Sequence, residues 1–176
     1  MSMRLLGAAL LMLVTTSCAT QTGARAVITG TTPGSPVSGL ARLTETPQGL
    51  RVAVRVAHVP PGRHGFHIHE VGLCGDEGKA AGGHYNPAGV PHGFLPTMGV
   101  HAAHAGDFGN IAVGRSGRGR LTLTLPGLTL TDGEFPVVGR AVILHAQPDD
   151  LTTQPTGNAG ARIGCGVIEA APAAAR

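Results

Sequence analysis

The apolar positions of this chain fall into short runs separated by glycine and proline. Within the runs, apolar or β-branched residues tend to alternate with polar ones, which is the period of two expected of strands. No run convincingly has the 3.6-residue period of an amphipathic helix. The pattern predicts eight strands, at residues 24–32, 39–46, 50–59, 65–70, 110–114, 120–125, 136–145 and 161–169. It therefore predicts an all-β fold, an eight-stranded Greek-key β-sandwich or barrel.

The segment from Val71 to Asp107 interrupts this pattern, because it is rich in glycine and proline and has little strand character. Loops of this length are uncommon inside compact domains unless they are functional. This loop carries His84, His92 and His104 and ends at Asp107. Three imidazoles and a carboxylate are an acceptable tetrahedral zinc set, and imidazole also suits copper. A long metal-binding loop is therefore expected.

Further histidines lie in predicted strands. If residues 65–70 form a strand, the period of two puts the imidazoles of His67 and His69 on one face and the flanking apolar side chains on the other. Alone, such a pair is more often two half-exposed histidines. His145 ends a distant apolar strand, which a sheet could bring beside the pair. The alternative is a histidine-rich loop that binds metals loosely.

The N-terminal residues have the pattern of a secretory signal peptide. A single arginine precedes an apolar run from Leu5 to Val14, which is too short to be a transmembrane helix. Cys18 follows a small residue, as at the lipid-attachment site of bacterial lipoproteins, although Thr15 stands where leucine is usual. We expect a signal peptide at 1–17, a lipid-linked tether at 18–24 and one domain at 25–176, in a periplasmic or cell-envelope protein. Plain signal cleavage near Cys18 is the alternative.

Charge and composition limit the classes of binding partner and the residues available for the core. The formal net charge is +3, with 13 Lys and Arg against 10 Asp and Glu, and no long basic run is present. A nucleic-acid partner therefore has little support. With no Trp, one Tyr and four Phe, the core must consist of Val, Leu, Ile and Ala. Nine histidines are more than a packed β protein needs.

Five strings taken in order resemble the copper/zinc superoxide dismutase family, over about residues 25–169: GFHIHE (65–70), GGHYNPAGVPH (82–92), HAGD (104–107), GRAVILHA (139–146) and GNAGARIGCGVI (157–168). The resemblance implies an antioxidant enzyme that converts superoxide to oxygen and hydrogen peroxide. It implies one copper per subunit on His67, His69, His84 and His145, and one zinc per subunit on His84, His92, His104 and Asp107. His84 would bridge the two ions and carry protons in catalysis.

The resemblance also implies roles for residues that bind no metal. Asp149 would link a copper histidine to a zinc histidine, and Arg162 would orient the incoming anion. Cys74 and Cys165 would form a disulfide. Without the resemblance, Asp149 would be interpreted as part of a solvated acidic turn and Arg162 as a surface charge. His101 lies outside the ligand pattern, although it could compete with His104.

The sequence departs from eukaryotic family members in two loops. One residue separates Gly72 from Cys74, where those members have a longer insert that contributes to their dimer contact, and the loop at 151–155 is also shorter. Their interface cannot be carried over, so a homodimer would use a different one. A non-catalytic copper- and zinc-binding lipoprotein on the same fold is the alternative function.

Overall fold

The protein is described by a computed structural model, which places residues 23–171. The main strands are β1 (Gly23–Gly30), β2 (Ser38–Thr46), β3 (Gly49–Ala57), β4 (Gly62–His69), β5 (Asp107–Val113), β6 (Gly119–Leu125), β9 (Ala141–His145) and β10 (Arg162–Val167). Shorter elements are β7 (Leu128–Thr129), β8 (Phe135–Pro136), β11 (Glu169–Ala171), the 3-10 helix η1 (Asp76–Ala81) and the helix α1 (Leu95–Met98).

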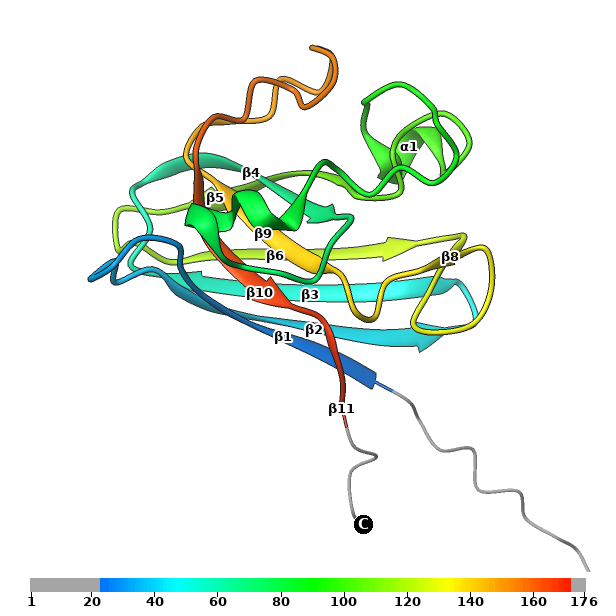
Figure 1. The fold of residues 1–176 in the computed structure, drawn as a ribbon, viewed down its shortest axis with the longest axis horizontal. Coiled ribbons are helices and arrows are strands. Elements are labelled where there is room, and N and C mark those ends of the chain that lie inside the picture. The colour runs from blue at the N-terminus through cyan, green and yellow to red at the C-terminus, as the bar shows by residue number, and fades with distance from the viewer. Residues whose placement is uncertain (1–22, 172–176) are drawn as a thin grey trace, which may run out of the picture.

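The eight main strands close into an antiparallel barrel. Their order is β10, β9, β4, β5, β6, β3, β2, β1, and β1 pairs in turn with β10. The chain passes from β3 to β4 although β3 lies beside β6, so the order includes a Greek-key crossover. Figure 1 shows α1 and the loop that follows β9 above the barrel. The predicted all-β, eight-stranded fold is confirmed.

Some predicted element limits are wrong. The strand expected at 136–145 begins only at Ala141, because the chain turns at Gly139, whose φ is 84°. The strand expected at 161–169 divides into β10 and β11 at Ile168, whose N–H donates to the Arg140 carbonyl. The long loop contains η1 and α1, and β5 begins at Asp107, which pairs with His67.

Burial explains why the site lies against β4 and β9. Strands β1 and β3 alternate between buried and exposed residues, but β9 and most of β4 are buried on both faces. Phe66 and Ile68 point into the main apolar core, as do Val142 and Leu144. The other face of both strands must therefore be covered by the loops. That face carries the histidines.

Candidate metal centre

Strands β4 and β9, the long loop and the start of β5 bring the seven predicted metal ligands together on the outer wall of the barrel. His67 and His69 come from β4 and His145 from the end of β9, whereas His84 forms an isolated β-bridge with His69. The other residues come from the long loop and the start of β5. All seven side chains are buried: His67, His69, His84, His92, His104, Asp107 and His145.

The first cluster consists of His67, His69, His84 and His145. One donor atom from each residue lies within 4.8 Å of every other. Backbone carbonyls orient two of the rings, because His69 Nδ1 donates to Gly82 at 3.0 Å and His145 Nδ1 donates to Gly160 at 3.2 Å. Their Nε2 atoms then face each other at 3.4 Å. Nitrogens held in this way present lone pairs to a common point.

The electrostatics of the first cluster favour neutral imidazoles. Burial is the largest cause, and nearby histidines and Arg162 add to it. Together they lower the pKa of His69 to about 2 and that of His145 to about 3. A metal ligand must be unprotonated at the coordinating nitrogen. These rings are therefore ready to bind a metal at neutral pH.

The second cluster surrounds the carboxylate of Asp107. His84 Nδ1 donates to its Oδ1 at 2.7 Å, while the Nδ1 atoms of His92 and His104 lie 2.8 and 3.2 Å from its two oxygens. Burial alone would raise the pKa of Asp107, but the three imidazoles around the carboxylate hold it well below its usual range. One donor atom from each of His84, His92, His104 and Asp107 again lies within 4.8 Å of the others.

Buried nitrogens without hydrogen-bond partners test whether ions fit here. Among the described residues, the unpaired buried nitrogens are His67 Nδ1, His84 Nε2, His92 Nδ1 and His104 Nδ1. Such atoms are costly to bury unless they are satisfied. His67 belongs to the copper set implied by the resemblance, His92 and His104 belong to the zinc set, and His84 belongs to both. The donor types suit both ions, so the residues fit the two metals.

The carboxylate of Asp149 links the two clusters by accepting a hydrogen bond from one histidine of each. His67 Nε2 donates to its Oδ2 at 2.8 Å, and His92 Nε2 donates to its Oδ1 at 2.9 Å. Burial would raise the pKa of Asp149, but these hydrogen bonds and the Leu151 N–H lower it. The carboxylate is therefore an ionised acceptor, which fixes the ring orientation of one histidine from each cluster.

Sequence reasoning missed the residues that hold this arrangement in place. The side chain of Asn110 both accepts from the Asp149 N–H and donates to its carbonyl, each at 2.8 Å. Gln154 pairs in the same manner with the backbone of His92, at 2.7 and 3.0 Å. A polar residue in the predicted strand at 110–114 was the one available signal for Asn110, and Gln154 had none.

Arg162 lies beside the first cluster, since its backbone is opposite His145 in the pairing of β10 with β9. Its guanidinium donates to the carbonyls of Gly78 and Gly82, each at 2.6 Å. Partial burial lowers its pKa from the usual range, but an arginine remains charged in proteins. Gly82 thus accepts from both Arg162 and His69, so the cation is fixed relative to the cluster.

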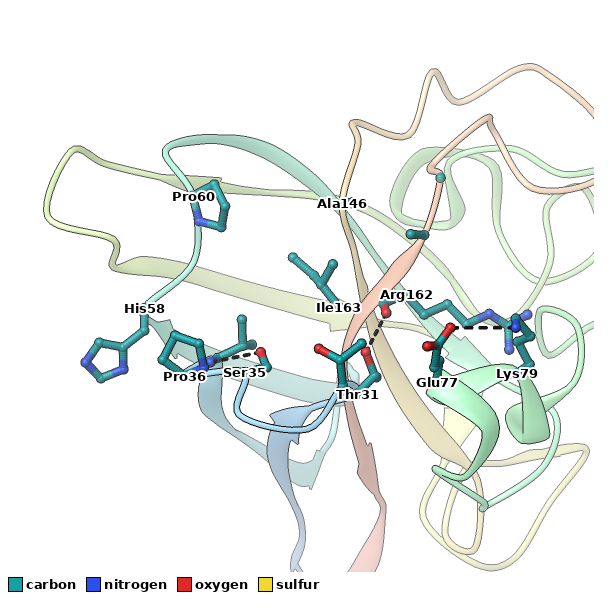
Figure 2. Close-up of a pocket in the computed structure, with 14 residues that line it drawn as sticks. Thr31, Ser35, Pro36, His58, Pro60, Glu77, Lys79, Ala146, Arg162 and Ile163 are labelled. Carbon is teal, nitrogen blue, oxygen red and sulfur yellow. Dashed lines mark hydrogen bonds and ion pairs between the residues drawn. The ribbon is translucent and has the colours of Figure 1, made fainter.

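A cavity of about 560 Å³ lies on the other side of Arg162. Figure 2 shows Thr31, Pro36 and Ile163 around it, with the ion pair of Glu77 and Lys79 nearby. No residue of either histidine cluster lines this cavity. Arg162 is the residue that links this cavity to the first cluster.

The disulfide pins the long loop to the barrel. Cys74 and Cys165 are bonded, and they pack beside Ala81 and Ile143 on the outer wall. His101 lies away from both clusters, against Phe135 at 5.8 Å between ring centroids. Cys18 lies outside the described residues. Within residues 23–171, none of the helices has both the length and the apolar character that a membrane crossing needs.

Comparisons with known proteins agree with this geometry. The family model described as copper/zinc superoxide dismutase matches residues 37–168. A relative named "Superoxide dismutase [Cu-Zn] 2", from Aquifex aeolicus (strain VF5), is 42% identical over 138 residues, which are 75% of this chain and 79% of the relative. A solved structure titled as that of the clock protein EA4 is 34% identical, with a TM-score of 0.73 over 85% of this chain and 95% of the other.

Proposed function

The chain belongs to the copper/zinc superoxide dismutase family, and we propose that its two histidine clusters form one active centre joined through His84. The enzyme converts superoxide to oxygen and hydrogen peroxide, with copper and zinc as cofactors. One copper would be held by His67, His69, His84 and His145. One zinc would be held by His84, His92, His104 and Asp107.

The buried Nε2 of His84 carries this proposal. It has no hydrogen-bond partner, whereas Nδ1 of the same ring contacts Asp107 at 2.7 Å. One ring therefore offers a nitrogen to each cluster. Burial lowers the pKa of His84 to about 4, against the opposing hydrogen bond to Asp107. The ring is consequently neutral at physiological pH and can coordinate at one nitrogen while the other is free.

The chain's own residues divide the remaining work. When bound, copper supplies the one-electron redox chemistry and zinc, which has a single stable oxidation state, fixes geometry and charge. His84 would take up a proton from water at Nε2 in the first half-reaction, when one superoxide gives up an electron and leaves as oxygen. It gives up that proton in the second, when another superoxide and a second proton from water become hydrogen peroxide.

Arg162 binds and orients the superoxide anion. Its guanidinium is a fixed cation next to His145, held by two carbonyls. Asp149 keeps His67 and His92 in the orientations that coordination needs. A non-catalytic metal carrier would need neither a fixed cation nor a shared imidazole, so the alternative function is not favoured.

Single substitutions in each cluster test the ligand assignment. His92→Ala should lose zinc and keep measurable copper-dependent activity, because His92 belongs to the second cluster alone. His145→Ala should lose copper and all activity. His101→Ala, in a histidine outside both clusters, is the control and should keep both metals. Full zinc occupancy in purified His92→Ala, measured by elemental analysis, would contradict the assignment.

The Cys74–Cys165 disulfide is consistent with an exported protein, because such bonds persist in oxidising compartments. We also propose that residues 1–17 are a signal peptide and that Cys18 is lipidated at the start of a short tether to the domain. In membranes washed at high salt, which removes electrostatic binding, Cys18→Ser should move the protein from the membrane fraction to the soluble periplasm at unchanged specific activity. Unchanged fractionation would refute lipidation. A homodimer with an interface unlike the eukaryotic one is a further prediction, testable by sedimentation.

A further inference from the structure

Six arginines lie on the outer face of one side of the barrel. They are exposed side chains of strands β1, β2, β3, β4 and β6: Arg25, Arg42, Arg51, Arg55, Arg63 and Arg120. Figure 1 shows β1, β2, β3 and β6 side by side. We call these six residues the arginine face. The described metal-cluster residues all come from β4, β5, β9 and the long loop, with their side chains buried.

Strand register places these arginines on the same face and against one another. Directly opposite residues of paired strands point to one side of a sheet. Arg25 is opposite Arg42, and Arg55 is opposite Arg120. Like charges directly opposite each other destabilise a sheet. Two such pairs therefore carry a cost that the fold itself does not require.

Carboxylates do not offset this charge. Within residues 23–171, none of the six arginines forms an ion pair. Glu169 of β11 is opposite Arg25 at the margin of the face. Glu45 lies on β2, but its carboxylate accepts from the Leu130 N–H. The centre of the arginine face is thus positive, and its guanidinium donors have no side-chain partner among the residues that the structure describes.

The centre of the face is also hollowed. A depression of about 330 Å³ is lined by Leu40, Ala53, Thr122 and four of the arginines, Arg42, Arg51, Arg55 and Arg120. Ala53, which has a small side chain, is opposite Arg42 in the register of β2 and β3. Arginine forks suit the paired oxygens of phosphate groups better than an ammonium does. The hollow therefore fits a phosphate-bearing headgroup.

We infer that the arginine face docks on a membrane surface rich in anionic phospholipids. Charge complementarity is the first support. The second is Val27, which lies between the exposed positions 25 and 29 of β1 and is 60% exposed, so an apolar side chain stands beside the cations. Both features suit the headgroup region of a bilayer.

The position of Cys18 near the arginine face also supports docking on a membrane surface. Strand β1, which carries Arg25 and Val27, begins at Gly23. Only five residue steps separate Gly23 from Cys18, so a lipid on Cys18 would lie within about 18 Å of the start of this strand. This step rests on the proposed lipidation, whereas the charge and the hollow do not. Docking would hold the domain on the bilayer with the buried metal clusters outside the arginine face.

Vesicle binding of the non-lipidated protein tests the docking separately from lipidation and catalysis. The mature chain carrying Cys18→Ser should sediment with vesicles of equal phosphatidylglycerol and phosphatidylcholine, and not with phosphatidylcholine alone. Binding should weaken as salt rises. Arg42→Gln with Arg55→Gln should lower the partition coefficient about 25-fold, since each arginine near an anionic surface contributes about fivefold.

Lys79→Gln with Arg115→Gln is the matched control, because it removes two charges outside the face and should change partitioning by less than about twofold. Superoxide removal by the Arg42/Arg55 variant should equal that of the parent, which also shows that it is folded. Equal loss of binding in both double variants would overturn the proposal. So would absence of parent binding to the anionic vesicles, including the case in which a soluble polyanion such as heparin binds the face instead.

Discussion

Gly157 is the position at which one added methyl group should break the link that Asp149 makes between the two metal clusters. Its φ is 63°, in the left-handed region, and a Cβ there would overlap Asp149 Oδ1 and lie 2.6 Å from His92 Nε2. The backbone cannot easily retreat, because the Gly157 N–H donates to Thr153 and its carbonyl accepts from Asp150. In Gly157→Ala the Asp149 carboxylate must therefore turn away from His92.

Two costs add in this variant. A left-handed alanine costs about 1 kcal/mol relative to glycine. Losing a hydrogen bond to a charged group costs about 1.5–3 kcal/mol. The free energy of unfolding of the metal-free protein should thus fall by about 3 kcal/mol. Zinc affinity should fall about 10- to 100-fold, which is the usual effect of losing the partner that orients a ligating histidine.

Gly89→Ala is the matched control, since Gly89 has the same φ of 63° and nothing within 4 Å of its Cβ position. It should cost about 1 kcal/mol and leave zinc affinity unchanged. Urea unfolding of the metal-free proteins and zinc competition with a chelator measure the two effects. If both variants lose the same stability and bind zinc equally well, Asp149 does not orient His92.

Three further outcomes are expected. Arg162→Glu should lower the second-order rate constant with superoxide by at least about tenfold and reverse its ionic-strength dependence, at unchanged metal content. The reason is electrostatic steering of the anion, for which superoxide dismutases are a known example. A stopped-flow rate constant and salt slope equal to those of the parent would exclude Arg162 from anion capture. Cys74→Ser should destabilise the protein by about 4 kcal/mol in denaturant unfolding, because the Cys74–Cys165 bond spans 91 residues, and Cys165→Ser should match it. In the folded protein the pKa values of three buried histidines are lowered to about 2, 4 and 3, for His69, His84 and His145. The unfolded chain therefore binds protons below pH 6.5 that the folded protein does not bind. The free energy of unfolding of the metal-free protein should consequently fall by up to about 4 kcal/mol per pH unit as the pH drops below 6.5. Equal urea midpoints at pH 7 and pH 5 would contradict this.

The fold was predictable where alternation marked a strand with one exposed face. Strands β1, β2, β3 and β6 follow that pattern. The turn at Gly139 was not predictable, because β-branched and apolar residues on both sides of it continue the strand pattern. Periodicity reports which residues are buried and does not report a single left-handed glycine.

The site divides in a similar way. Histidines and acidic residues can be identified directly in the sequence, so the two clusters could be predicted. The groups that aim them are partly backbone, such as the carbonyls of Gly82 and Gly160 that accept from His69 and His145. Every residue has a carbonyl, so a sequence gives no sign of which one meets a ring. The arginine face was missed because its members are spread over five strands and converge only through register.

Superoxide decay after pulse radiolysis tests the central claim most directly, using protein loaded with one copper and one zinc per chain. We expect catalytic removal over many turnovers, with one oxygen and one hydrogen peroxide formed per two superoxide anions. The second-order rate should approach the diffusional ceiling of about 10⁸–10⁹ M⁻¹s⁻¹, for which superoxide dismutases are a standard example. Consumption of a single superoxide per bound copper, followed by uncatalysed decay, would contradict the account.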